Sequence, residues 1–384
     1  MSDSICFQRG SFPMLKHWNY LSSCSQSALH EDVLEAMNDY QKSLLVIGNN
    51  WDIAIEKLEK TRASFAKFIG AEVDEIAIVP SVSDAISRIT MSLPIIKERN
   101  TLVFTDLDFP TVGQILQAQK EQGFRLEMIH SENGVIETDA YEKEVSENTL
   151  LTYIPHVCYY NGFKQDIKSI SNIVHQKGSL LFVDAYQSAG HIPIHVKEMD
   201  IDICTTGMRK YMLGIAGIAF LYIKKDLMDQ LKPKSLGWLG QDKHSMFNLT
   251  HPTLATSARR FEGGTPSFIS IFAAHAALEL FQKLDLQSIS NYHEDLTQKI
   301  LEYAIEHRLP ISGSLNIKKR SSLTSFYVEN AEKLGKLFKH RNINVTTKDQ
   351  VIRMAPHFYN TYDEVVQMMD VLVKHNSDEW QRRC

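Results

Sequence analysis

Cysteine is scarce in this chain, and its distribution excludes two common kinds of site. Five of the 384 residues are cysteine, and no two of them form a CxxC pair. They are Cys6, Cys24, Cys158, Cys204 and Cys384. An odd number at such spacing argues against a disulfide framework and against a zinc site, so we expect no metal centre. Unpaired thiols fit a reducing compartment, and we therefore expect a cytoplasmic protein.

Long apolar runs and an excess of one charge are missing as well. No run approaches the roughly 20 apolar residues of a membrane-spanning helix, and no basic segment followed by an apolar one opens the chain. The formal net charge is −5, which gives no reason to expect nucleic acid or an anionic membrane as a partner. These absences favour chemistry on a small molecule.

Two nucleotide-binding motifs are also absent. No GxGxxG follows the early strand-like runs, and no GxxxxGK[ST] occurs anywhere in the chain. Hypotheses of dinucleotide or nucleoside triphosphate binding therefore lack their motifs. His156 stands in HVCYY without the spacing of a metal ligand.

Short β-prone runs alternate with helical segments through the first two thirds of the chain. The predicted strands are 76–79, 101–105, 125–129, 150–154, 180–183, 201–204 and 216–223. This alternation predicts the α/β class, with a mainly parallel sheet between layers of helices. Beyond about residue 309 the segments are shorter and more charged, which is typical of a smaller α+β domain. We expect an N-terminal arm (1–30) that joins the small domain, a large domain (31–266) and a small C-terminal domain (267–384).

An acid and a lysine each follow one of these predicted strands. Asp184 follows the run 180–183, and Lys210 follows the run 201–204 and a Thr-Thr-Gly turn. Parallel strands of an α/β sheet end at the edge where ligands bind. A desolvated lysine can form a Schiff base with an aldehyde, and an acid can keep a pyridine nitrogen protonated. The ordinary alternatives are a surface lysine and a helix N-cap.

Three further positions have a functional and an ordinary interpretation. In PSVSDAIS a helix is predicted to begin near Asp84, and Ser83 at its N-terminus can hold a phosphate; the alternative is an N-cap serine. Phe109 stands in a turn, where it can stack on a flat cofactor or simply fill the core. Arg353 ends a short strand, where it can bind a substrate carboxylate or form a surface ion pair.

Four motifs, in this order, resemble one known family. They are PSVSDAIS, VDAYQSAGHIPI, TTGMRKYMLG with GIAFLYI, and RFEGGTP. Together they resemble the pyridoxal-phosphate enzymes of fold type I, in the class V aminotransferase group. That group also holds cysteine desulfurases, isopenicillin epimerase-like proteins and kynureninase. The resemblance covers nearly the whole chain and implies pyridoxal 5′-phosphate as the cofactor.

The resemblance assigns roles around the cofactor ring. Lys210 is similar to the lysine that holds the cofactor aldehyde, and Asp184 to the partner of the pyridinium nitrogen. Gln187 resembles the residue that bonds the ring hydroxyl. Phe109 takes the ring-stacking place that is histidine in desulfurases. Arg353 matches the arginine that binds the substrate carboxylate.

Other roles concern the phosphate and a second subunit. Val82 and Ser83 match the turn that holds the cofactor phosphate. Gly264 and Thr265 match the loop that reaches the phosphate of the other subunit's cofactor, which implies a homodimer with shared active sites. Trp238, in GWLG, resembles a tryptophan near that pocket in kynureninase-like members.

The chain also departs from the family pattern. Arg209 precedes the Schiff-base lysine, where histidine or tyrosine is usual, and we expect it to contact the phosphate. Gly207 stands where many relatives have a serine. Cys158 and Tyr159 stand where relatives often have an asparagine near the ring.

The resemblance implies Schiff-base chemistry on an α-amino acid, with an aminotransferase first. A β-lyase acting on a C–S bond and a kynureninase-like C–C hydrolase are the alternatives. A persulfide-relaying desulfurase is disfavoured because no cysteine lies between 311 and 360. A non-catalytic cofactor-binding protein is disfavoured because both Lys210 and Arg353 are present. The sequence does not specify the amino acid; we expect selectivity from the loops LSSCSQSAL and 241–256.

Overall fold

A seven-stranded sheet forms the centre of the molecule. The computed structural model describes residues 6–243 and 249–383. The strands, in chain order, are β2 (Ile76–Val79), β3 (Thr101–Thr105), β4 (Arg125–Ile129), β5 (Thr149–Pro155), β6 (Leu180–Asp184), β7 (Ile203–Gly207) and β8 (Ala219–Ile223). Their order across the sheet is β2-β8-β7-β6-β5-β3-β4. Only β8 runs antiparallel to its neighbours among these strands, which confirms the predicted mainly parallel α/β sheet.

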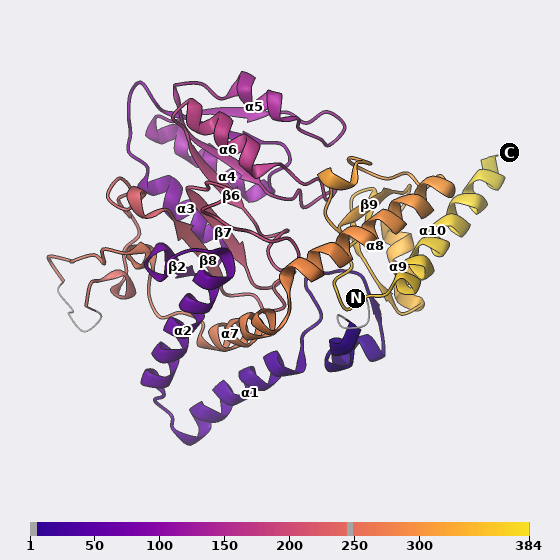
Figure 1. Ribbon diagram of the computed structural model, residues 1–384, viewed down its shortest axis with the longest axis horizontal. Helices are drawn as coiled ribbons and strands as arrows, with labels where there is room; N and C mark the ends of the chain where they lie inside the picture. The colour runs from indigo at the N-terminus through magenta and orange to yellow at the C-terminus, as the bar shows by residue number, and fades with distance from the viewer. Residues whose placement is uncertain (1–5, 244–248, 384) are drawn as a thin grey trace.

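Helices cover both faces of this sheet (Figure 1). One face packs on α3 (Val82–Ser92) and α4 (Pro110–Gln119). The other packs on α2 (Trp51–Ile69), α6 (Ile167–Gln176) and α7 (Phe268–Lys283). Successive strand residues point to opposite faces, which is why the strands are almost continuously apolar.

Two more helices pack against helices that cover the sheet. Helix α1 (Glu31–Val46) packs on α7, and α5 (Thr138–Glu144) packs on α6. The connection between α1 and α2 projects from the body of the molecule (Figure 1). The last turn of α1, just before this connection, carries apolar side chains that are strongly exposed: Leu45 is 86% exposed and Val46 is 84% exposed.

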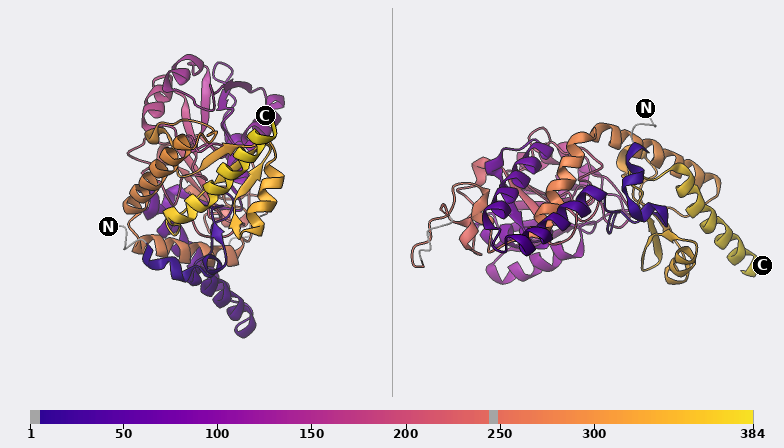
Figure 2. Two further views of the ribbon diagram at one scale, coloured as in Figure 1. Left: turned by 90° about the vertical axis from the view of Figure 1, so that its right-hand side faces the viewer. Right: turned by 90° about the horizontal axis from the view of Figure 1, so that it is seen from below.

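A smaller three-stranded antiparallel sheet lies beside the large one, at the C-terminal end of the molecule (Figure 2). Its order is β11 (Thr346–Lys348), β12 (Val351–Met354) and β9 (Thr324–Tyr327). The helices α8 (Leu286–Glu306), α9 (Ala331–His340) and α10 (Tyr362–Arg383) share its core. The N-terminal β1 (Asn19–Tyr20) pairs in parallel with β10 (Ile343–Asn344).

The predicted domain boundaries stay predictions. Helix α7, which follows the boundary placed at 267, packs against α1 and α2. Short 3-10 helices are η1 (Cys6–Ser11), η2 (Pro13–Lys16), η3 (Val73–Glu75), η4 (Lys120–Gln122), η5 (Lys225–Leu227), η6 (Trp238–Gly240), η7 (Ala258–Phe261) and η8 (Ile317–Lys319). Within the described ranges, no helix has the length and apolar character needed to cross a bilayer.

Candidate active site

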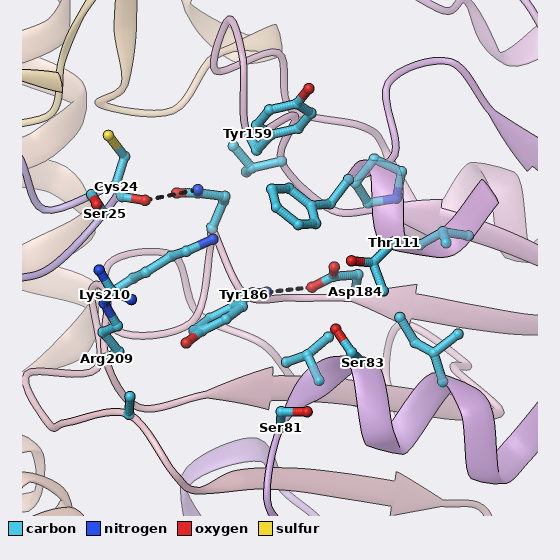
Figure 3. Close-up of a pocket in the computed structure, with 18 of the residues that line it drawn as sticks. Cys24, Ser25, Ser81, Ser83, Thr111, Tyr159, Asp184, Tyr186, Arg209 and Lys210 are labelled. Atoms are coloured by element: carbon cyan, nitrogen blue, oxygen red, sulfur yellow. Dashed lines mark hydrogen bonds between the residues drawn. The ribbon is translucent and has the colours of Figure 1, made fainter. Parts of the chain in front are cut away.

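A cavity of about 370 Å³ opens between the carboxyl edge of the large sheet and the small sheet. Figure 3 shows the residues around it, with Tyr159 above and the N-terminus of α3 below. The predicted site residues that line it are Val82, Ser83, Phe109, Asp184, Gln187, Arg209, Lys210 and Arg353. These positions span 272 residues of the chain, counted from 82 to 353, so the fold brings distant segments together.

Lys210 lies in the turn that follows β7. The turn is held close to the segment after β6: a Cβ on Gly190 would lie 2.1 Å from the Tyr211 carbonyl oxygen, and Gly190 has a φ of +97°. The Lys210 Nζ lies 4.0 Å from the centre of the Tyr186 ring and 5.8 Å from that of Phe109. Burial lowers the pKa of Lys210 to about 8, although the charge of Asp184 opposes this shift.

Asp184 ends β6 and lies in the same cavity. Its Oδ1 accepts a hydrogen bond of 2.8 Å from the Tyr186 N–H. Burial raises the pKa of Asp184, while this hydrogen bond and the charge of Lys210 lower it. A partly buried carboxylate with a single backbone donor is suited to a cationic partner.

Gln187 lines the cavity, and its side-chain oxygen is an unpaired hydrogen-bond acceptor. Its Nε2 donates to the Cys24 carbonyl oxygen at 3.0 Å. Its Oε1 is buried and has no hydrogen-bond partner within the described residues. Buried polar atoms are nearly always paired, so this oxygen is a position where a ligand would be expected.

The N-terminus of α3 faces the cavity with its first residues. Ser81 is the N-cap, and its side chain accepts from the Asp84 N–H at 3.0 Å. The ordinary N-cap interpretation therefore holds for Ser81, and α3 begins at Val82 rather than near Asp84. The Ser83 hydroxyl is exposed toward the cavity. A free hydroxyl beside the first N–H groups of a helix is a suitable anion site.

The structure does not support the ordinary interpretations of Phe109 as a core residue and of Arg353 as part of a surface ion pair. The Phe109 side chain is 46% exposed and contacts the Tyr159 ring edge-on at 5.0 Å between centroids, so it does not fill the core. Arg353 is 9% exposed and donates from Nη1 to the Tyr159 carbonyl oxygen at 2.8 Å. It has no carboxylate within 4 Å among the residues the structure places, so it forms no surface ion pair there.

Three predicted residues do not line the cavity of their own chain. Gly264 and Thr265 are exposed. Trp238 packs against Trp51, with 5.4 Å between ring centroids. The preceding Glu262 is fixed on β2, where it accepts from the Ile78 N–H at 2.8 Å. If Gly264, Thr265 and Trp238 contact a cofactor as predicted, that cofactor is the one bound by another chain.

A comparison with known proteins decides the family. The family model described as aminotransferase class V matches residues 19–367. The chain belongs to this family. Membership confirms the predicted enzyme class and pyridoxal phosphate as the cofactor.

Individual relatives agree with this assignment. The chain is 45% identical over 362 residues to the uncharacterized aminotransferase YcbU of Bacillus subtilis strain 168, covering 94% of this chain and 95% of that protein. It is 28% identical over 348 residues to a kynureninase of Bacillus thuringiensis subsp. konkukian, covering 86% and 79%. Among solved structures, the apo cysteine desulfurase of Thermococcus onnurineus NA1 has a TM-score of 0.87 at 24% identity, covering 96% of both chains.

The structure explains one departure of this class V aminotransferase from the family pattern. A Cβ on Gly207 would lie 2.6 Å from Cζ of Tyr186 and 2.8 Å from its hydroxyl oxygen. The Tyr186 ring therefore occupies the space that a side chain at position 207 would need. Arg209 is exposed and lines the cavity, and its contact with the phosphate stays a prediction.

Sequence reasoning missed several residues of this cavity. Tyr186, Cys24, Ser25 and Lys348 line it as well. Cys24 and Ser25 come from the predicted selectivity loop LSSCSQSAL, and the side chain of Cys24 is buried. Of the second predicted loop, residues 244–248 lie outside the described residues, as does Cys384. Strand alternation around a two-residue turn would have placed Lys348 on the same face as Arg353.

The described residues contain no group of three or more His, Cys, Asp and Glu side chains that could hold a metal ion.

Proposed function

We propose that this protein is an aminotransferase in which Lys210, Asp184 and Arg353 act together on an α-amino acid. The observation that carries the proposal is that these three side chains, from three separate segments, line one cavity. The family assignment and the 45% identical aminotransferase support it. The choice of transamination as the reaction is based on these relatives, because the cavity alone does not distinguish it from the other reactions.

The cavity fits the family's cofactor. Its volume of about 370 Å³ lies in the range of small-molecule sites. The unpaired Oε1 of Gln187 can accept a hydrogen bond from a hydroxyl group of a ligand. Asp184 would hold the ring nitrogen, Gln187 the ring hydroxyl, and Val82 with Ser83 the phosphate. When bound, pyridoxal phosphate supplies an aldehyde for the substrate amine and a ring that withdraws electrons.

The remaining chemistry falls to the protein's own side chains. Arg353 binds the substrate carboxylate with its planar guanidinium and so orients the α-carbon. Lys210, with a pKa of about 8, is substantially neutral in mildly basic solution. It can therefore take the α-proton and return it to another carbon. Asp184 stays anionic against a cationic partner and so keeps the ring nitrogen protonated.

The proposal includes a homodimer with shared active sites. Gly264 and Thr265 are exposed and do not line their own cavity, as expected of residues that serve a partner. We also propose a cytoplasmic location, because Cys24, Cys158 and Cys204 are all free thiols.

An absorbance measurement tests the cofactor and the lysine. The purified protein should have a visible cofactor band that changes when amino acids are added. Lys210→Ala should remove this band, whereas Lys333→Ala, at an exposed position on α9, should keep it. A band that no amino acid alters would contradict an enzyme, and a band that survives Lys210→Ala would mean that another lysine holds the cofactor.

A product assay separates the candidate reactions. Transamination should form more than one equivalent of keto acid per active site only when a keto-acid acceptor is present, because the cofactor itself takes up the first amino group. Turnover without an acceptor, with release of ammonia, would contradict transamination and favour a β-lyase. Cleavage of kynurenine to an aromatic amine and alanine would favour the C–C hydrolase.

A further inference from the structure

The hairpin of β11 and β12 places two positively charged side chains, Lys348 and Arg353, in the lining of the cavity. Thr346 pairs with Arg353 and Lys348 with Val351, so Lys348 and Arg353 lie diagonally on one face of the hairpin. Both contact Tyr159. The Lys348 Nζ lies 3.0 Å from its hydroxyl oxygen, and the Arg353 Nη1 lies 2.8 Å from its carbonyl oxygen. The two positive groups are therefore held at one side of the cavity, around a single residue.

The charge of the cavity is unbalanced. Four cations line it, namely Arg209, Lys210, Lys348 and Arg353, against the single carboxylate of Asp184. None of the four lies within 4 Å of a carboxylate in the described part of the chain. Positive groups gathered in a cavity without counter-ions favour an anionic ligand, because desolvating them unpaired costs energy.

The proposed function accounts for three of these cations. Lys210 serves the aldehyde, Arg209 is predicted to contact the phosphate, and Arg353 takes the α-carboxylate. Lys348 is left with a phenol hydroxyl as its partner. It is a flexible point charge on the substrate side of the cavity, which suits it to a second anion rather than to the bidentate grip that Arg353 offers.

We propose that the substrate is an α-amino acid whose side chain carries a second anionic group, such as a carboxylate, and that Lys348 binds this group. The inference rests on the proposed function, because it takes Arg353 as the site of the α-carboxylate. Lys348 is then a specificity-determining residue. Tyr159, which bonds both Lys348 and Arg353, sets the relation between the two anion sites.

Unreactive acids test this subsite without turnover. Succinate and butyrate have four carbons, and glutarate and pentanoate have five; all lack an amine and cannot react with the cofactor. Their dissociation constants are measured in the holoenzyme at constant ionic strength, from the change in the visible cofactor band. We expect one of the dicarboxylates to bind roughly tenfold more tightly than the monocarboxylate of equal length, since one charged contact is worth about 1.4 kcal/mol.

Variants assign the preference to Lys348. Lys348→Met should reduce the preference to about twofold or less and leave monocarboxylate binding unchanged, whereas Lys348→Arg should retain it. Lys339→Met removes the same charge from an exposed position on α9 and should change nothing. Higher salt should weaken dicarboxylate binding more than monocarboxylate binding.

Two outcomes would overturn the inference. One is equal affinity for dicarboxylates and monocarboxylates in the unaltered protein. The other is a Lys348→Met variant that weakens both classes equally, which would mean that Lys348 binds the α-carboxylate or supports Tyr159 only. Either result in a protein that keeps its cofactor band leaves the proposed function standing. A protein without that band would contradict the proposed function itself.

Discussion

At the scale of single residues, the protonation of Lys210 sets a pH dependence. Burial lowers its pKa to about 8, against about 10.4 for an ordinary lysine. Only the neutral amine attacks an aldehyde. The rate at which apo-protein binds pyridoxal phosphate should therefore rise with pH and level off above about 8, falling about tenfold for each unit below it. Stopped-flow absorbance measures this rate.

The cofactor also titrates, so a model amine is the control. Nα-acetyl-lysine in the same pH series has an ordinary pKa, and its rate should still rise at pH 9.5. A protein whose rate rises in parallel with the model amine would show that Lys210 is not desolvated.

Gly207 provides a second prediction at this scale. A methyl group there would meet the Tyr186 ring at 2.6 Å, so Gly207→Ala should destabilise the fold by about 1–3 kcal/mol. Gly10→Ala is the control, since a Cβ there meets no atom within 4 Å. In a Tyr186→Ala background the cost of Gly207→Ala should fall below about 0.5 kcal/mol. Denaturant unfolding measures all four variants, and equal costs in both backgrounds would refute the steric explanation.

At the scale of elements, one buried ion pair ties α2 and β2 to the RFEGGTP segment. Arg62 and Glu262 are each 1% exposed. Arg62 donates to both carboxylate oxygens of Glu262, from Nη2 at 3.3 Å and from Nη1. Arg62 Nη1 also donates to the Ile76 carbonyl oxygen at 3.0 Å. The pair therefore holds the start of the loop that leads to Gly264 and Thr265.

Glu262→Gln should lower the free energy of unfolding by about 2 kcal/mol, because Arg62 loses its buried carboxylate partner and keeps only the half-exposed Glu59, to which its Nε donates at 3.0 Å. The amide oxygen can still accept from the Ile78 N–H and from Arg62 Nη1, so the effect reports the lost charge together with the hydrogen bond from Arg62 Nη2. Glu332→Gln breaks the exposed pair with Lys336 and should change stability by less than about 0.5 kcal/mol. Similar unfolding midpoints for the two variants would contradict a structural role of the buried pair.

The sequence predicts elements well where one physical rule governs them. Asp184 and Lys210 could be brought together because parallel strands end at one edge of a sheet. For α3 the sequence predicts a start near Asp84, two residues late, because two serines compete for the cap and Ser81 takes it. Strand alternation indicates only that Lys348 shares a face with Arg353; how far Lys348 reaches into the cavity depends on how the small sheet packs against the large one. Gly207 could not be explained until the position of Tyr186 was known.

At the scale of the whole molecule, the tip at the end of α1 and the loop at Gly264 are both exposed in the described part of the chain. Leu45, Val46 and Ile47 are 86%, 84% and 54% exposed. Apolar side chains gathered in this way commonly mark a protein interface. A second copy of the chain is the occupant that the proposed function requires, and light scattering should give twice the chain mass.

Complementation tests whether that dimer shares its active sites. Lys210→Ala removes the lysine, and in the proposed dimer Thr265→Glu would place a carboxylate beside the partner's phosphate; each variant alone should be nearly inactive. In a mixed dimer, one site combines an intact Lys210 with an intact Thr265 from the other chain. After subunit exchange, equal amounts should regain roughly a quarter of the unaltered activity, because half of the dimers are mixed and each has one complete site. The activity of the mixture is assayed against that of each variant alone. If mixed dimers form but the mixture stays inactive, Thr265 serves the site of its own chain, because each chain of a mixed dimer would then carry one defective residue in its own site.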